Sequence, residues 1–214
     1  MLLIAFAATL LIFAVFEPLF LKENGKRNRA VVWKTAATLC AAALAAASFF
    51  GTPDAFCFWI FIGILVSALS DAVIHFFLGA GALAFMATHG CFVTAFLLRA
   101  GFRPLISGIL FLLAVLMALF LFRGQFGKLG KMLPVCLLYV VILSAMFSVG
   151  FATLFSVGVS ALPIAAGALL FYVSDLLVAK NVFLSTSPRS EAVAMTTYYG
   201  AEFLFALAAF LAAF

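Results

Sequence analysis

Charged residues are scarce in this chain of 214 residues, and their scarcity excludes most soluble folds. Asp, Glu, Lys and Arg make up only 9% of the sequence, and apolar residues make up 68%. Soluble domains contain about 25% charged and about 45–50% apolar residues. A soluble fold cannot hide this much apolar surface, because its outside must face water. The composition therefore predicts an all-α membrane protein, built almost entirely of transmembrane helices.

Paired cysteines and clustered histidines are missing as well. The four cysteines all fall within apolar runs and lack the paired spacing of a zinc site (Cys40, Cys57, Cys91 and Cys136). Buried thiols of this kind behave as small apolar groups, so we expect neither disulfides nor a redox role. The chain has only two histidines, whereas a catalytic zinc takes about three protein ligands. Glycine-rich phosphate loops and Gly-x-Ser-x-Gly sequences are also absent, so the sequence predicts neither a metal nor a cofactor.

Polar residues divide the chain into eight apolar segments, each close to the roughly 20 residues that cross a bilayer as a helix. These segments are 2–21, 31–50, 56–75, 77–98, 104–122, 132–151, 158–180 and 193–213. The first has no basic flank and no small-residue cleavage site, which favours a retained span over a signal peptide. Residues 1–214 are therefore predicted to form a single transmembrane domain, an eight-helix bundle. The very short break near 75–77 predicts a helical hairpin between the third and fourth spans.

The basic residues predict the orientation of the bundle. They gather in the loops that follow the odd-numbered spans, at Lys22, Lys26, Arg27, Arg29, Arg123, Lys128, Lys131 and Arg189. The loops after the even-numbered spans hold only Arg99 and Arg103. Because basic loops stay on the cytoplasmic side, we expect both termini outside, across the inner or plasma membrane if the source is bacterial. The net charge of +5 suits anionic lipid headgroups better than nucleic acid.

Two segments of the chain share one pattern. Residues 63–71 and 167–175 both read Gly-x-Leu-x-x-x-(Leu/Val)-Ser-Asp, at an offset of 104 residues, and they end at Asp71 and Asp175. Spans four apart point the same way across the membrane, so the pattern fits a parallel 4+4 repeat, as in many membrane proteins. Coincidence in an apolar sequence is the alternative, but an aspartate inside a span is costly.

Ionisable side chains inside the apolar segments mark the candidate site, because placing one there costs on the order of 2.5–3.5 kcal/mol. The costly residues and their tyrosine partners are Glu17, Lys34, Asp71, His75, His89, Asp175, Lys180, Glu202, Tyr139, Tyr198 and Tyr199. With a helical rise of about 1.5 Å per residue, nearly all lie within roughly 18 Å of the cytoplasmic ends of their spans. This distribution predicts a polar cavity that opens toward the cytoplasmic leaflet.

Several of these residues also have a purely structural explanation. Lys34 and Lys180 can snorkel to the headgroups. His75 can lie in a solvated turn, and His89 can form a hydrogen bond between helices. Glu202 can pair with Lys34 and hold two helices together. The two aspartates are the hardest to explain by packing alone, because both follow a serine at matching positions.

The motifs resemble those of the YhhN-like membrane proteins, which include the lysoplasmalogenases. The resemblance covers roughly residues 34–202 and is carried by residues 63–71, 77–89, 134–139 with Met146, 167–183 and 199–202. The segment 167–183 is the most specific, and it is similar to the family pattern Gly-Ala-x-x-Phe-x-x-Ser-Asp-x-x-x-Ala. The chain departs from the usual family residues at Ser70, Thr35, Phe92 and Glu202 but keeps both aspartates.

The resemblance implies an enzyme that hydrolyses the vinyl ether bond of lysoplasmalogens to a fatty aldehyde and a glycerophospho-base. Protonation of a vinyl ether at carbon gives an oxocarbenium ion that water attacks, so the demands are those of glycoside hydrolysis: one carboxyl as acid and one carboxylate. We expect Asp71 and Asp175 to be the catalytic pair, with their order open. The expected substrate-binding or supporting residues are Lys34, which could bind the phosphate, with His89, Tyr139, Ser174, Asn181, Tyr199 and Glu202. The expected partners are a lyso-ether phospholipid and membrane lipids, and no protein partner can be inferred.

Two other functions fit parts of the sequence. Repeats and carboxylates inside a membrane also suit a small proton-coupled transporter or a lipid-binding membrane protein. A transporter needs polar residues in both leaflets, however, and here they gather in one. Asp71 and His75 share a helix face and, with His89 and Asp175, suggest a metal-dependent hydrolase of the ceramidase type, which the small number of histidines disfavours.

Overall fold

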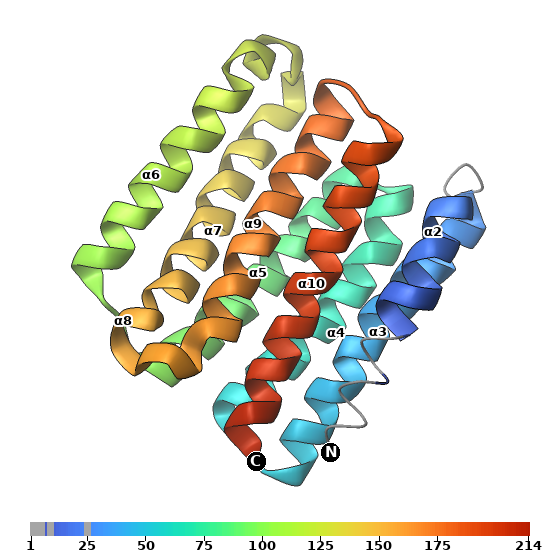
Figure 1. The fold of residues 1–214 in the computed structure, drawn as a ribbon. Coiled ribbons are helices and arrows are strands. Elements are labelled where there is room, and N and C mark those ends of the chain that lie inside the picture. The colour runs from blue at the N-terminus through green and yellow to red at the C-terminus, as the bar shows by residue number, and fades with distance from the viewer. Residues whose placement is uncertain (1–6, 8–10, 24–26) are drawn as a thin grey trace.

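The computed structural model describes residues 7, 11–23 and 27–214 of the chain. Within these residues every regular element is a helix (Figure 1). The long helices are α3 (Arg27–Gly51), α4 (Ala55–Phe76), α5 (Leu78–Ala100), α6 (Pro104–Phe122), α7 (Leu133–Ala152), α9 (Leu162–Phe183) and α10 (Pro188–Ala213). Shorter pieces are η1 (Leu11–Phe16), α2 (Glu17–Glu23), η2 (Arg123–Lys128), η3 (Gly130–Met132), α8 (Leu154–Val157) and η4 (Gly158–Ala161).

Local sequence explains where these helices begin and end. Asp54 accepts hydrogen bonds from the backbone of Phe56 and Cys57 and so caps α4. Ser187 caps α10, with Pro188 at the first helical position. Phe77 alone separates α4 from α5, which confirms the tight hairpin predicted near residues 75–77. His75 lies in the last turn of α4, not in a loop.

The protein is a multi-pass integral membrane protein. Six segments of the described chain are long and apolar enough to cross a bilayer, and the fifth, Gly130–Phe183, contains both α7 and α9. Residues 2–6 and 8–10 of the predicted first span 2–21 lie outside the described residues, as does Lys26 of the first predicted loop. The count of eight spans and the 4+4 repeat therefore stay predictions.

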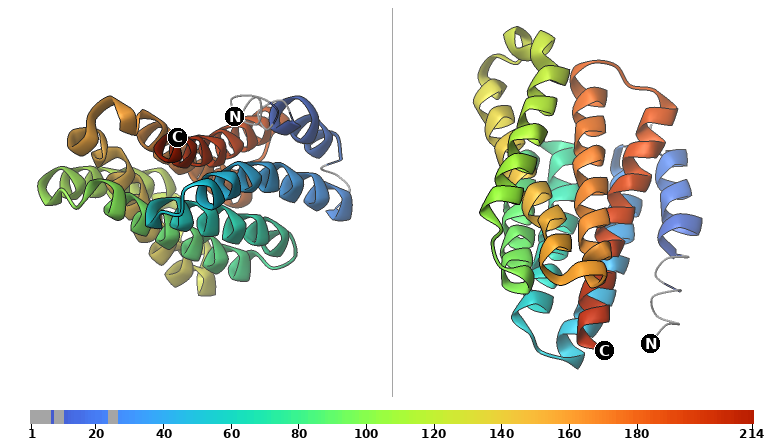
Figure 2. Two further views of the ribbon diagram at one scale, coloured as in Figure 1. Left: turned by 90° about the horizontal axis from the view of Figure 1, so that it is seen from below. Right: turned by 60° about the vertical axis from the view of Figure 1, so that its left-hand side comes forward.

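Helix α10 is the centre of the bundle and α6 lies at its edge. Helix α10 packs against α9, α3, α4 and α2, whereas α6 packs mainly against α7. Figure 2 shows α10 between α9 on one side and α3 and α2 on the other, and α6 on the outside of the molecule. The apolar side chains of α6 mostly face outward, including Leu105, Leu112, Leu116 and Phe120, as expected for a helix that contacts lipid.

The loops divide between the two ends of the bundle. At one end, called the basic end here, lie the α4–α5, α6–α7 and α9–α10 connections (Figure 1). The α6–α7 connection carries Arg123, Lys128 and Lys131, and Arg189 lies in the first turn of α10. The α3–α4 and α5–α6 connections lie at the opposite end, together with the C-terminus. There Thr52 donates a 3.0 Å hydrogen bond to the carbonyl of Ala213.

Candidate active site

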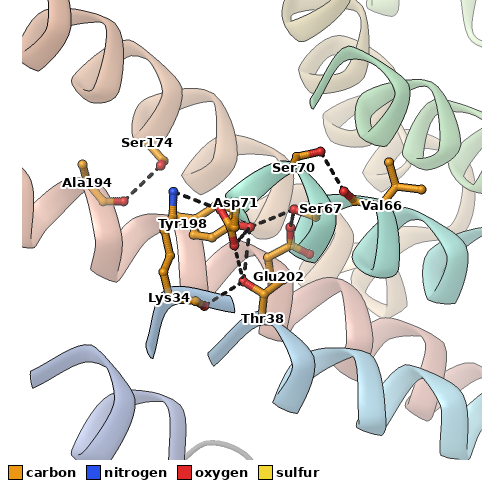
Figure 3. A network of polar contacts seen from close by, with 10 residues as sticks. All are labelled: Lys34, Thr38, Val66, Ser67, Ser70, Asp71, Ser174, Ala194, Tyr198 and Glu202. Atoms are coloured by element: carbon orange, nitrogen blue, oxygen red, sulfur yellow. Dashed lines mark hydrogen bonds and ion pairs between the residues drawn. The ribbon is translucent and has the colours of Figure 1, made fainter. Parts of the chain in front are cut away.

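Three helices bring six polar side chains together in the Asp71 cluster, which consists of Lys34, Thr38, Ser67, Asp71, Tyr198 and Glu202 (Figure 3). Helices α3, α4 and α10 each contribute two residues one turn apart, and such residues lie on the same helix face. Because these three helices pack against one another, the three faces meet inside the bundle. Asp71, Thr38, Ser67 and Glu202 are fully buried.

Asp71 is held by a cation and two hydroxyl groups. The ammonium of Lys34 lies 2.9 Å from Asp71 Oδ1. Thr38 and Tyr198 donate hydrogen bonds to Asp71 Oδ2, at 2.6 and 2.8 Å. A buried charge is stable only when it is paired and hydrogen-bonded, and these three partners meet that need. Removing one member of such a buried pair typically costs about 3–5 kcal/mol.

A chain of hydroxyl groups links Asp71 to the second carboxyl of the cluster. Ser67 Oγ lies 2.8 Å from the hydroxyl of Tyr198 and is hydrogen-bonded to Glu202 Oε1. The other oxygen of Glu202, Oε2, is buried and has no hydrogen-bond partner. The sequence suggested that Glu202 could pair with Lys34, but the structure does not pair them. Glu202 is instead linked to Asp71 by hydrogen bonds that run through Ser67 and Tyr198.

The second aspartate belongs to a separate group, the Asp175 cluster, made by Asp175, His89 and Tyr139. Tyr139 donates a 2.7 Å hydrogen bond to Asp175 Oδ2, and His89 Nε2 lies 3.2 Å from the same oxygen. The imidazole of His89 is completely buried and meets the ring of Phe171 edge to face, at 4.9 Å between ring centroids. Helices α5, α7 and α9 thus position Asp175 without a lysine or arginine in the cluster.

A cavity lies between the two clusters. Its polar wall includes Lys34, Tyr139, Asp175 and Tyr198, and most of the remaining lining is apolar and comes from α5, α6, α7 and α9. The cavity has a volume of about 140 Å³ and is partly open to the outside. Gln125, Phe126 and Met132 of the α6–α7 connection also line it, so the cavity extends to the basic end.

The predicted site residues differ in their relation to this cavity. Lys34, Tyr139, Ser174 and Asp175 line it. Asp71, His89 and Glu202 are absent from its lining and lie behind residues that form it. Two predicted residues neither line the cavity nor belong to a cluster. The side chain of Asn181 accepts a 2.7 Å hydrogen bond from Ser190 where α9 and α10 connect, and the buried hydroxyl of Tyr199 has no hydrogen-bond partner.

Thr38 and Ser67 were missed by the sequence prediction, although a signal for them exists. Each lies four residues from a predicted site residue, Thr38 after Lys34 and Ser67 before Asp71. Residues at this spacing share a helix face, so a small hydroxyl residue there is in reach of the same partner. Tyr198 and Glu202 show the same spacing on α10. A search for polar pairs four residues apart would have found the whole Asp71 cluster.

The acidic and histidine side chains do not converge on one point. Asp71 pairs with Lys34 and Asp175 with His89, and His75 belongs to neither cluster. In residues 7, 11–23 and 27–214, no three His, Cys, Asp or Glu side chains are grouped so that they could hold a metal ion. The polar groups that line the cavity, or lie directly behind its wall, are carboxyl, hydroxyl, imidazole and ammonium groups.

Comparisons with known proteins agree with the resemblance seen in the motifs. The chain is 35% identical over 161 residues to the protein of Bos taurus named lysoplasmalogenase TMEM86A, and the aligned region covers 70% of this chain and 64% of the relative. It is 38% identical over 148 residues to lysoplasmalogenase TMEM86B of Sus scrofa, and here the aligned region covers 67% of this chain and 60% of the relative. The chain thus matches about three fifths of the length of these relatives. No solved structure matches the chain.

The family follows from a match that covers most of the sequence. The model of the YhhN family matches residues 29–209, a range that includes both clusters and every residue that lines the cavity. The chain is a member of the YhhN family.

Proposed function

We propose that this protein is an ether hydrolase that cleaves the vinyl ether bond of a lysoplasmalogen and releases a fatty aldehyde and a glycerophospho-base. One observation carries the proposal: a carboxyl group stands in the wall of an otherwise apolar cavity, in a chain related to proteins named lysoplasmalogenase. The apolar lining suits a hydrocarbon chain. The ammonium of Lys34 at the same cavity suits an anionic phosphate.

The reaction needs one acid and one water molecule. Transfer of a proton to the outer carbon of the vinyl ether gives an oxocarbenium ion, and water then adds to the carbon bonded to oxygen. That water gives a proton back to the carboxylate, and the resulting hemiacetal separates into the aldehyde and the glycerol hydroxyl. The carboxyl group ends the cycle with its proton restored, as acid and base in turn.

The two aspartates have different roles in this proposal. Asp175 lines the cavity, so we assign it the proton transfers to and from the substrate. Tyr139 and His89 orient its carboxyl group. Asp71 lies behind the cavity wall, where it holds Lys34 and Tyr198 in place.

Membrane orientation completes the proposal. The cavity extends to the end of the bundle that carries the basic connections, and basic loops stay in the cytoplasm. The substrate would therefore enter from the cytoplasmic leaflet, with both termini on the other side. We also propose that residues 1–214 form one transmembrane domain, with eight spans in a parallel 4+4 arrangement.

A lipid panel on purified protein tests the proposal. We expect aldehyde release from a lysoplasmenyl lipid and none from its 1-alkyl counterpart, which lacks the double bond that is protonated. Asp175→Asn should abolish the release, and Asp71→Asn should reduce it at least tenfold, because Lys34 then loses its partner. Glu191→Gln, in the first turn of α10, is the matched control and should behave as wild type. Turnover by Asp175→Asn close to wild type would exclude the proposed acid. Absence of any turnover, together with lipid uptake by reconstituted vesicles, would favour a transporter.

A further inference from the structure

The Asp71 cluster contains more oxygen contacts than its hydroxyl hydrogens can serve. Three contacts run in a row: Glu202 to Ser67, Ser67 to Tyr198 at 2.8 Å, and Tyr198 to Asp71 at 2.8 Å. Each hydroxyl has one hydrogen to donate, so Ser67 and Tyr198 supply two hydrogens for three contacts. Thr38 donates its own hydrogen to Asp71 Oδ2 at 2.6 Å. If both carboxyl groups were ionised, one contact would press two oxygen atoms together with no hydrogen between them.

The missing hydrogen must come from a carboxyl group, and the surroundings decide which one. Both oxygens of Asp71 have partners that suit a carboxylate, with Lys34 at one and two hydroxyl groups at the other. Glu202 has no cation, and its Oε2 is buried without a hydrogen-bond partner. An ionised oxygen in that position would lack any compensation. A neutral Glu202 with its hydrogen directed at Ser67 leaves only a carbonyl oxygen unpaired, which costs less.

Charges on the neighbouring helices point the same way. The acidic groups that act on Glu202 from other helices are Asp71 of α4 and Asp175 of α9. Lys34 of α3 is already paired with Asp71, and Glu17 of α2 is hydrogen-bonded to Thr196 of α10. With Glu202 neutral, the Asp71 cluster contains one positive and one negative charge. A net charge of zero is the least costly state for a site buried in a membrane protein.

We infer that Glu202 carries a proton in the resting protein, and that this proton sets the direction of the hydrogen-bond chain from Glu202 through Ser67 and Tyr198 to Asp71. Glu202 is then a positioning residue: it acts through Asp71 and Tyr198 on the polar wall of the cavity. The reverse order, with the proton on Asp71, is reached when three protons each move by one contact. The proton of Glu202 moves to Ser67, the proton of Ser67 moves to Tyr198, and the proton of Tyr198 moves to Asp71, so that one O–H bond breaks and one forms at each step.

Infrared spectroscopy of the full-length protein in lipid nanodiscs tests the resting state without any need for activity. At neutral pH the wild-type protein should show the C=O band of the protonated Glu202, in addition to that of the proposed acid Asp175. Glu202→Gln should remove the Glu202 band, and Glu191→Gln should retain it. A wild-type spectrum that Glu202→Gln leaves unchanged would overturn the inference.

A second pair of variants separates the effect of hydrogen-bond direction from the effect of side-chain size at position 202. Glutamine can donate an N–H to Ser67 in place of the carboxyl hydrogen, so Glu202→Gln should melt close to wild type. Leucine has a similar size and no donor, so Glu202→Leu should lower the melting temperature and loosen the site. Equal melting of the two variants, either both normal or both low, would show that hydrogen-bond direction does not matter.

The pH profile of hydrolysis gives a third measurement, which rests on the proposed function. Above the pH at which Glu202 ionises, the chain loses its third hydrogen and a second negative charge appears near Asp71. The wild-type rate should therefore fall on the alkaline side, and in Glu202→Gln this fall should move to higher pH. Identical alkaline limbs would contradict the positioning role. A protonated band in a protein that hydrolyses no vinyl ether would leave the inference standing and remove the proposed function.

Discussion

Two aspartates with the same sequence motif have different chemical surroundings. Asp71 forms an ion pair with Lys34, whereas Asp175 contacts His89 and Tyr139. The serines before them differ as well. Ser70 donates to the carbonyl of Val66 in its own helix, and Ser174 donates to the carbonyl of Ala194 on α10. The motif places both aspartates inside helices, but the neighbouring helices determine what each carboxyl group can do.

Tyr139 is the residue on which the proposed acid depends most directly. Tyr139→Phe removes the 2.7 Å hydrogen bond to Asp175 Oδ2 and leaves the ring in place. Hydrogen bonds to charged groups contribute about 1.5–3 kcal/mol, so kcat should fall on the order of 10- to 100-fold, with a smaller change in KM. Steady-state aldehyde release measures both constants.

Tyr172→Phe is the matched control for Tyr139→Phe. Tyr172 donates a hydrogen bond of the same length, 2.7 Å, to the carbonyl of Ala114, and it does not line the cavity. Removal of the Tyr172 hydroxyl should lower the melting temperature and leave kcat unchanged. Equal losses of kcat in the two variants would mean that Tyr139 acts through packing and not through Asp175.

The α4–α5 hairpin is the element that brings Asp71 and His89 into adjacent helices, and it depends on one glycine. A Cβ atom at Gly81 would lie 2.2 Å from the Cα and 2.6 Å from the backbone nitrogen of Ile74. No side-chain rotation can relieve a clash with backbone atoms. The close approach of the two helices near Phe77 therefore requires glycine at this position.

Gly81→Ala should force the hairpin apart. Overpacking in a core typically costs about 1–3 kcal/mol, and a clash with backbone is at the upper end, so the melting temperature should fall by several degrees. Gly90→Ala on the same helix has open space around the new Cβ and should be neutral or slightly stabilising. Thermal unfolding in detergent compares the two, and a Gly81→Ala variant as stable as Gly90→Ala would contradict the close packing.

The cavity and most of the buried charged groups lie toward one end of the bundle. Lys34, Asp71 and Asp175 lie in the halves of α3, α4 and α9 nearer the basic end, whereas Glu202 lies just past the middle of α10. The opposite half is packed with aromatic rings, among them Phe92, Phe96 and Phe205. A continuous polar path across the bundle would suit transport, whereas a cavity that reaches one end suits an enzyme that takes its substrate from one leaflet.

Cysteine labelling tests this orientation. In a variant without the four native cysteines, Thr186→Cys places a thiol in the exposed α9–α10 connection at the basic end, and Phe102→Cys places one in the exposed α5–α6 connection. A membrane-impermeant maleimide added to intact cells should label Phe102→Cys and spare Thr186→Cys. Labelling of both sites after permeabilisation is the control, and the opposite pattern in intact cells would reverse the proposed orientation.

Local physical chemistry let the sequence predict much of this protein. Apolar runs close to the thickness of a bilayer indicate helices, and the predicted run 104–122 has the same bounds as α6. The cost of placing an ion in lipid is enough to single out Lys34, Asp71, Asp175 and Glu202. These inferences need only the composition and spacing of residues along one helix.

Tertiary structure decided which of these residues meet. The sequence could not assign Lys34 to Asp71 instead of Glu202, because both carboxyl groups were within reach of a long, flexible side chain. The packing of α10 between α3, α4 and α9 makes that choice, and it also separates Asp71 from the cavity wall while Asp175 remains in it. Hydrophobicity along a helix determines its burial, but the partner of a buried polar group depends on the rotation and contact of whole helices, which only the folded bundle specifies.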